Sequence, residues 1–138
     1  MPDLIRTYID LPAKLTEVYA YVADPATGPM VSHAREVVDV TKDNGSVVAF
    51  KTKHGVVKYV TVAPPHYLEG DYQQKRARTR YDIRFEALGE ARTRVSIDVN
   101  IQPQSLRAKM QGPLPRLRAK SQINDWLVQA RQHFKAQK

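Results

Sequence analysis

Apolar residues at every second position run through most of this chain and constrain its fold more than any other feature. In the clearest case, Val95, Ile97, Val99 and Ile101 alternate with polar residues, which is the period of a strand with one buried face. Similar segments occupy residues 4–11, 34–41, 47–53, 56–62 and 67–73, and the stretch containing Tyr81, Ile83 and Phe85. The turns between them include Lys42-Asp43-Asn44-Gly45, His54-Gly55, Ala63-Pro64-Pro65 and Leu88-Gly89-Glu90. We therefore predict one antiparallel sheet of about seven strands, connected mostly by hairpins.

Helical spacing replaces this alternation twice. Residues 12–23 are predicted to form a short helix, because Pro12 suits a first helical turn and apolar residues then recur every three or four positions. A further turn could follow at residues 25–32. After Pro103, a helical turn at residues 105–110 precedes a long helix over residues 115–136. The apolar stripe of that long helix consists of Ile123, Leu127, Ala130 and Phe134, with Trp126 near its edge. We expect an α+β fold in which a curved sheet packs on this C-terminal helix.

Length and composition exclude several classes of protein. The 138 residues suit a single domain spanning residues 1–138, and no run of about 18 apolar residues predicts a membrane span. No signal peptide is visible at the N-terminus, so a cytoplasmic location is expected. The absence of cysteine rules out disulfides, iron–sulfur clusters and a cysteine nucleophile. The four histidines lack metal-ligand spacing, and neither a nucleophile-elbow nor a phosphate-loop motif occurs. We therefore expect no metal, no cofactor and no catalytic residue.

The positive charge of the chain is concentrated near its end. Residues 104–138 contain eight Lys/Arg and one acidic residue, Asp125, so they carry +7 of the formal net charge of +8. A basic segment of this kind can bind an anionic membrane, nucleic acid or an acidic protein. It can equally be a solvated helix surface. Nucleic acid is the less favoured partner, because only Tyr72 and Tyr81 lie near the other basic tract, residues 75–80.

Several local sequences, together with the order of the elements, resemble one known family. They are Leu11-Pro12-Ala13 with Val18, Ala63-Pro64-Pro65-His66-Tyr67-Leu68, Phe85-Glu86-Ala87, Ala91-Arg92-Thr93-Arg94-Val95 and Gly112-Pro113-Leu114. These sequences resemble the helix-grip fold of the START/polyketide-cyclase (SRPBCC) superfamily. The resemblance implies an internal cavity between the sheet and the C-terminal helix that accepts an apolar ligand. One departure is that residues 24–33 lack the tryptophan that many relatives carry after the first helix.

Tyrosines are the first candidates for ligand contact. If Val57-Tyr59-Thr61, Leu68-Gly70-Tyr72 and Tyr81-Ile83-Phe85 form the inner faces of neighbouring strands, then Tyr59, Tyr72, Tyr81 and Phe85 face the cavity. A tyrosine there offers an apolar ring and one polar group with which to orient a ligand. The alternative is that these tyrosines are structural core residues. A register shift of one residue would turn every side chain to the other face.

The long helix supplies the second group of candidates, Arg116, Lys120, Ile123 and Leu127. A helical projection places Arg116 and Lys120 on the apolar stripe, where an unpaired charge is costly to bury. They could meet an anionic head group at the mouth of the cavity. Alternatively, both side chains extend outward into solvent, or they pair with a carboxylate such as Asp98 or Glu69.

Three functions remain open on the sequence. The first is binding or carriage of a hydrophobic small molecule, such as a lipid, an isoprenoid quinone or a polyketide-like compound, and it is the one we expect. The second is an enzyme of the cyclase, dehydratase or hydrolase type in the same cavity, with His33 or His66 as the acid–base group. The third is binding of an anionic membrane or nucleic acid through the basic C-terminal segment. The oligomeric state is not indicated.

Overall fold

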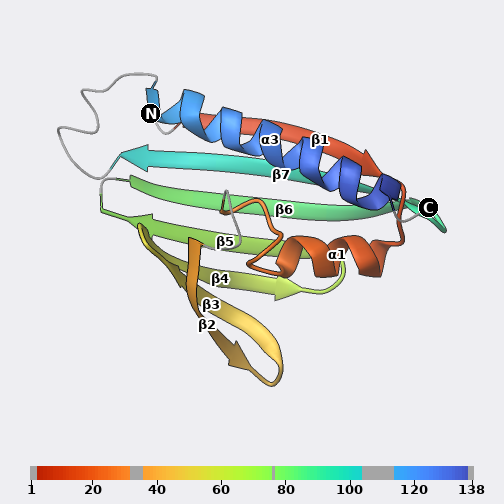
Figure 1. Ribbon diagram of the computed structural model, residues 1–138, viewed down its shortest axis with the longest axis horizontal. Helices are drawn as coiled ribbons and strands as arrows, with labels where there is room; N and C mark the ends of the chain where they lie inside the picture. The colour runs from red at the N-terminus through yellow and green to blue at the C-terminus, as the bar shows by residue number, and fades with distance from the viewer. Residues whose placement is uncertain (1–2, 32–35, 76, 104–113, 137–138) are drawn as a thin grey trace.

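Seven strands form one antiparallel sheet in the computed structural model, which describes residues 3–31, 36–75, 77–103 and 114–136. The strands are β1 (Asp3–Leu11), β2 (Val37–Asp43), β3 (Ser46–Thr52), β4 (Gly55–Ala63), β5 (Tyr67–Gln74), β6 (Ala77–Gly89) and β7 (Arg92–Pro103). Their order across the sheet is β1-β7-β6-β5-β4-β3-β2 (Figure 1). The predicted sheet is therefore confirmed. The basic tract at residues 75–80 enters β6 rather than only preceding it.

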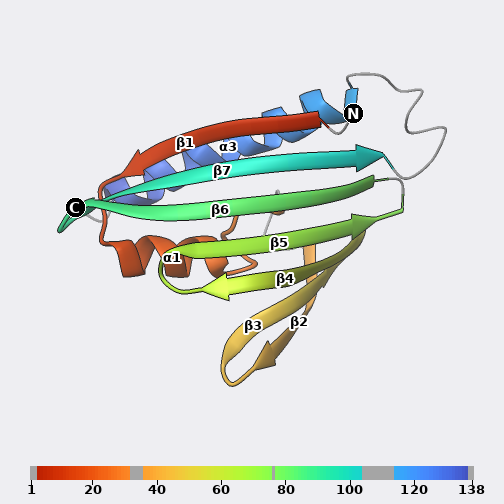
Figure 2. The ribbon, with the colours of Figure 1, turned by 180° about the vertical axis from the view of Figure 1, so that it is seen from behind.

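Two helices, α1 (Leu15–Ala23) and α3 (Leu114–Ala136), lie on the same face of the sheet. The helix α3 runs along β1, and α1 contacts β6 and β7. In the opposite view both helices lie behind the strands (Figure 2). This arrangement confirms the α+β helix-grip fold that the sequence predicts. No helix in the described part of the chain is long and apolar enough to span a membrane.

The core lies between the helices and the inner face of the sheet. Alternate residues of β6 and β7 are fully buried there, including Ile83, Phe85, Val95, Ile97 and Val99. The helix α3 contributes Ile123, Trp126, Ala130 and Phe134, whereas Leu127 is half-buried. The buried stripe of α3 is thus rotated toward Trp126, which the sequence had placed only near its edge.

The helix α1 begins at Leu15, three residues later than the sequence predicts. Lys14 occupies the N-cap position in an extended conformation. Two hydrogen bonds hold the preceding residues out of the helix: the Ala13 N–H donates to the Leu11 carbonyl over 2.9 Å, and the Thr93 hydroxyl donates to the Ala13 carbonyl over 2.9 Å. The helix ends before Asp24 because the residue that precedes a proline is driven into extended geometry.

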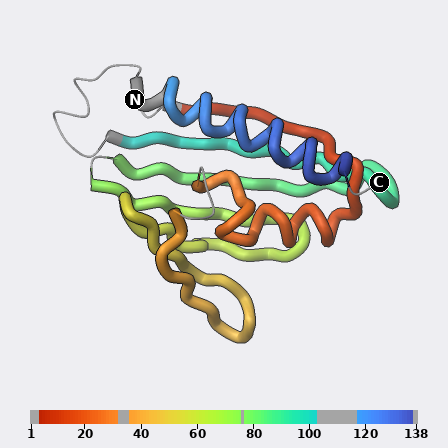
Figure 3. The backbone as a smooth tube through the Cα atoms, viewed as in Figure 1, coloured from red at the N-terminus to blue at the C-terminus, as the bar shows by residue number. Residues whose placement is uncertain are grey.

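The β2–β3 hairpin leaves the surface formed by the other strands and projects to one side (Figure 3). Its turn is formed by Asn44 and Gly45, whose φ angles of 53° and 81° fit the tight turn that Asn-Gly favours. The turn is shorter than predicted: Lys42 and Asp43 belong to β2. Lys42 is therefore a strand residue with a defined face.

Several ion pairs lie on the outer face of the sheet, and in one of them the carboxylate is buried. Asp71 on β5 is only 4% exposed, and its carboxylate accepts hydrogen bonds from Arg78 Nη2 over 2.6 Å and from Arg78 Nε over 3.0 Å. These bonds from the Arg78 guanidinium keep the pKa of Asp71 below its usual value. The ionised pair therefore stabilises the fold.

The acid dependence of stability tests this pair. A carboxyl group with a lowered pKa stabilises the fold above the pKa of the unfolded chain, about 4, and loses that effect as pH falls through its folded pKa. We expect Asp71→Asn to be less stable than the parent at pH 7, and the difference to shrink below about pH 4. Denaturant unfolding at several pH values measures this. Asp43→Asn in the exposed hairpin is the control, and a difference for Asp71→Asn that stays constant down to pH 2 would contradict the assignment.

Candidate functional site

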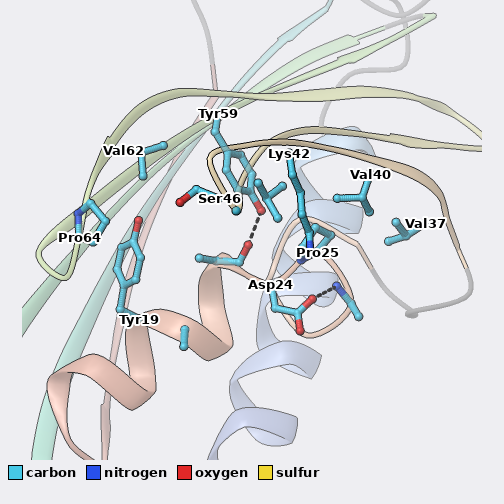
Figure 4. Close-up of a pocket in the computed structure, with 15 residues that line it drawn as sticks. Tyr19, Asp24, Pro25, Val37, Val40, Lys42, Ser46, Tyr59, Val62 and Pro64 are labelled. Atoms are coloured by element: carbon cyan, nitrogen blue, oxygen red, sulfur yellow. Dashed lines mark hydrogen bonds between the residues drawn. The ribbon is translucent and has the colours of Figure 1, made fainter.

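A pocket of about 600 Å³ lies between the C-terminal end of α1 and the strands β2, β3 and β4 (Figure 4). Its floor and walls come from three parts of the chain: α1 with the three residues after it, the β2–β3 hairpin, and the second half of β4. The lining residues are Tyr19, Ala20, Ala23, Asp24, Pro25, Ala26, Val37, Val40, Lys42, Gly45, Ser46, Val47, Tyr59, Val62 and Pro64. The pocket is therefore mainly apolar, with a few polar groups.

The pocket opens where the sheet divides. The register of β3 with β4 comprises three pairs, from Lys51↔Val56 to Ala49↔Lys58, and ends there. Beyond these pairs the hairpin and the second half of β4 diverge. The β4 strand keeps its pairing with β5 as far as Ala63↔Tyr67, so only the hairpin departs.

Two β-bulges turn valines into this space. In β3 the register shift between Thr41 and Lys42 leaves one extra residue, Val48, so that Val47 pairs with Lys42 and both line the pocket. In β4 a shift between Tyr59 and Thr61 places Val62 opposite Leu68 on the inner face. Strict alternation from Tyr59 predicts Thr61 at this position, but Thr61 is exposed. That part of the predicted inner face is therefore wrong by one residue.

The end of α1 and the segment that follows it, residues 24–31, are held from both sides by hydrogen bonds. From β4, the Tyr59 hydroxyl donates to the Ala23 carbonyl over 2.7 Å. From α3, the indole N–H of Trp126 donates to the Thr27 carbonyl over 2.8 Å, and the Gln122 amide donates to the Pro29 carbonyl over 3.2 Å. The resemblance leads one to expect a tryptophan within this segment, and the chain's single tryptophan reaches it from α3 instead.

Two charged side chains stand at the exposed rim. Asp24 accepts a hydrogen bond from the Ala26 N–H over 3.0 Å, which shapes the turn after α1. Lys42 extends from the hairpin and is exposed, and within the described part of the chain no carboxylate pairs with it. Both charges therefore remain in contact with solvent.

Tyr19 is the polar group at the inner side of the pocket. It extends from α1 while Tyr59 extends from β4 on the opposite wall (Figure 4). The Tyr19 side chain packs edge to face on Phe85, with 5.0 Å between ring centroids, and the residue is 9% exposed. Its hydroxyl oxygen is buried and has no hydrogen-bond partner among the described residues. Burial raises the pKa of Tyr19, so the phenol is neutral.

The structure separates the four aromatic candidates. Tyr59 lines the pocket. Tyr72, Tyr81 and Phe85 point to the inner face and are buried in the core rather than lining the pocket. The Tyr72 hydroxyl lies 2.6 Å from the Thr52 hydroxyl, so that its polar group is already satisfied.

The candidates on α3 whose side chains are described do not line the pocket. Ile123 is buried in the core, Leu127 is half-buried and Lys120 is exposed. Arg116 is the third residue of α3, and its side chain lies outside the described part of the structure. Lys120 is thus not among the residues that line the described pocket, whereas Lys42 is.

The resemblance implies a cavity between the sheet and the C-terminal helix, and the pocket that the described residues form lies beside α1 and the hairpin. Several large side chains are buried between the sheet and the helices. Trp126 and Phe134 are buried beneath α3. Met30 is buried against Gly70 of β5, where its thioether occupies the space that a β-carbon would need. These side chains belong to the buried core.

Of the two histidines considered as acid–base groups, His66 is exposed and does not line the pocket. Its backbone joins the turn between β4 and β5, since its N–H donates to the Ala63 carbonyl and its carbonyl accepts from the Phe85 N–H, each over 2.9 Å. His33 falls outside the described residues.

Comparisons with known proteins identify the fold. No family model and no curated protein matches the sequence. A START superfamily protein from Mycobacterium smegmatis superposes with a TM-score of 0.70 at 12% identity, covering 98% of this chain and 99% of that one. A polyketide-cyclase-like protein from Corynebacterium glutamicum gives 0.68 at 18% identity, covering 99% and 94%. An aromatase/cyclase from Streptomyces sp. R1128 gives 0.60 at 11% identity, covering 94% of each chain. This chain therefore has the START-like fold that its local sequences resemble.

Replacing Tyr59 tests how the pocket wall is held. Tyr59→Phe removes only the hydroxyl and leaves the Ala23 carbonyl, at the end of α1, without that donor. We expect the free energy of unfolding to fall by about 1 kcal/mol and amide exchange to accelerate at residues 23–28. Tyr8→Phe, which makes the same atomic change on the exposed outer face, is the control. Unchanged exchange at residues 23–28 would show that this hydrogen bond does not hold the wall.

Proposed function

We propose that this protein binds a hydrophobic small molecule in the pocket between α1, residues 24–26 and strands β2–β4. The observation that carries the proposal is the pocket itself. Its volume of about 600 Å³ falls in the range of small-molecule sites, and valine, alanine and proline side chains form most of its lining. Lipids, isoprenoid quinones and polyketide-like compounds are the candidate ligand classes.

The exposed surface next to the pocket supports uptake of an apolar ligand. Val40 and Val62 line the pocket and are still 38% and 41% exposed. Apolar side chains that remain in water gain stability when a ligand covers them, at about 25 cal/mol per Å² of apolar surface. The hairpin and β4 thus provide an apolar mouth that leads into the pocket.

The chemistry of the pocket favours binding over catalysis. An acid–base mechanism needs a titratable group within hydrogen-bond reach of the bound substrate and with a pKa near the working pH. Of the described lining residues, the two that carry charge are Asp24 and Lys42, and both stand at the exposed rim. The inner polar groups are Tyr19 and Tyr59, and burial raises the pKa of both phenols further from neutrality.

A variant that fills the pocket tests the proposal. Ala20 lines the pocket from the exposed side of α1, so Ala20→Phe adds a ring to the binding space with little effect on the core. We expect the affinity for the apolar dye Nile red to fall at least about tenfold, since a displaced ligand loses several buried groups at about 0.8 kcal/mol each.

Thr16→Phe is the matched control, because Thr16 is also exposed on α1 but does not line the pocket. It should bind Nile red as the parent does. Equal affinity of the parent, Ala20→Phe and Thr16→Phe would contradict binding at this site. Mass spectrometry of an organic extract of natively purified protein would identify the class of a retained ligand.

A further inference from the structure

The Tyr19 hydroxyl lies at an apolar pocket and has no hydrogen-bond partner among the described residues. Buried hydroxyls in folded proteins almost always have a hydrogen-bond partner, and leaving one unpaired costs free energy. Tyr19 is 9% exposed, its hydroxyl oxygen is out of contact with solvent, and within the described residues nothing accepts from it or donates to it. Within the described structure, the Tyr19 hydroxyl is therefore a hydrogen-bonding group that the fold leaves unsatisfied.

Two neighbouring tyrosines, unlike Tyr19, have hydroxyls that are hydrogen-bonded within the fold. The hydroxyl of Tyr59, on the opposite wall, donates to the Ala23 carbonyl over 2.7 Å. The hydroxyl of Tyr72, in the core, lies 2.6 Å from the Thr52 hydroxyl. Both groups are used within the fold, which leaves Tyr19 as the inner hydroxyl that can bond to a ligand.

The ring of Tyr19, and not its hydroxyl, accounts for its packing in α1. Its ring fills the core side of α1 between Val18 and Val22 and packs on Phe85. A phenylalanine would make the same apolar contacts. The hydroxyl group is thus the part of the side chain that packing does not explain.

We infer that the pocket selects an apolar molecule with a neutral carbonyl oxygen, which accepts a hydrogen bond from the Tyr19 hydroxyl. This inference rests on the proposed function and defines the ligand class within it. The carbonyl of a ketone, quinone or ester has the required acceptor lone pairs and is cheap to bury once it is bonded. A hydrocarbon of the same shape leaves the hydroxyl unpaired.

The charge distribution favours a neutral group at this end. Among the described residues that line the pocket, Lys42 is the one cation, and it is exposed at the rim. A carboxylate beside Tyr19 would be buried away from that cation, which is costly. Any anionic part of the ligand would therefore lie at the rim, with the carbonyl at the inner end.

A matched pair of probes tests the inference directly. Fluorene and 9-fluorenone share a rigid tricyclic skeleton and differ by a methylene in place of a carbonyl. Their affinities are measured by displacement of Nile red from the parent, Tyr19→Phe and the control Tyr8→Phe, whose tyrosine lies 62% exposed on the outer face. Comparing the ratio of affinities between variants cancels the difference in water solubility between the two probes.

We expect the preference for 9-fluorenone over fluorene to be about three- to tenfold greater in the parent and in Tyr8→Phe than in Tyr19→Phe. Fluorene should bind Tyr19→Phe at least as tightly as the parent. The thermal midpoint of ligand-free Tyr19→Phe should not fall, because the removed hydroxyl makes no hydrogen bond to any described residue. A folded Tyr19→Phe that keeps the full preference overturns the inference while leaving the proposed function intact.

A different result marks failure of the proposed function itself. If neither Nile red nor either probe binds the parent protein, the pocket is not a hydrophobic-ligand site and the inference falls with it. If the probes bind but Tyr19→Phe is destabilised as strongly as a core truncation, the hydroxyl is structural and the inference is overturned.

Discussion

The segment that follows α1 depends on hydrogen bonds from two elements that are distant in sequence. Tyr59 of β4 holds the last turn of α1, and Trp126 of α3 holds the turn beyond it. This segment has no partner strand, so its backbone carbonyls would otherwise require water. The two donors fix it as a wall, and the pocket exists because that wall stands apart from the hairpin.

The C-terminal helix contributes both to the core and to the surroundings of the pocket. Trp126 and Phe134 of α3 are buried against the rest of the fold, and the Trp126 indole N–H holds the segment that follows α1. A substitution at Trp126 should therefore affect both the core and the site.

The division of the sheet provides the other half of the pocket. A hairpin held to its neighbour by three residue pairs costs little to bend, because few ladder hydrogen bonds are lost. The bulges in β3 and β4 then direct Val47 and Val62 into the opening. Apolar residues of the sheet thus line the pocket.

Sequence periodicity predicted the sheet, the long helix and the inner faces of β5 and β6, because burial of one face dictates alternation over many residues. It could not predict the bulges, since one extra residue in a strand leaves the composition unchanged. It therefore placed Thr61 where Val62 lies, and it assigned Lys42 to a turn. Tyr19 was visible as part of an apolar stripe, but its unpaired hydroxyl depends on neighbours that only the fold brings together.

The central claim is that ligand binds beside α1 and the hairpin rather than beneath α3. Amide chemical shifts recorded by NMR during titration with Nile red test it most directly. The account predicts that the largest changes cluster at residues 19–26, 42–47 and 59–64. Changes concentrated along α3 around Ile123 and Leu127, with residues 42–47 unaffected, would contradict it.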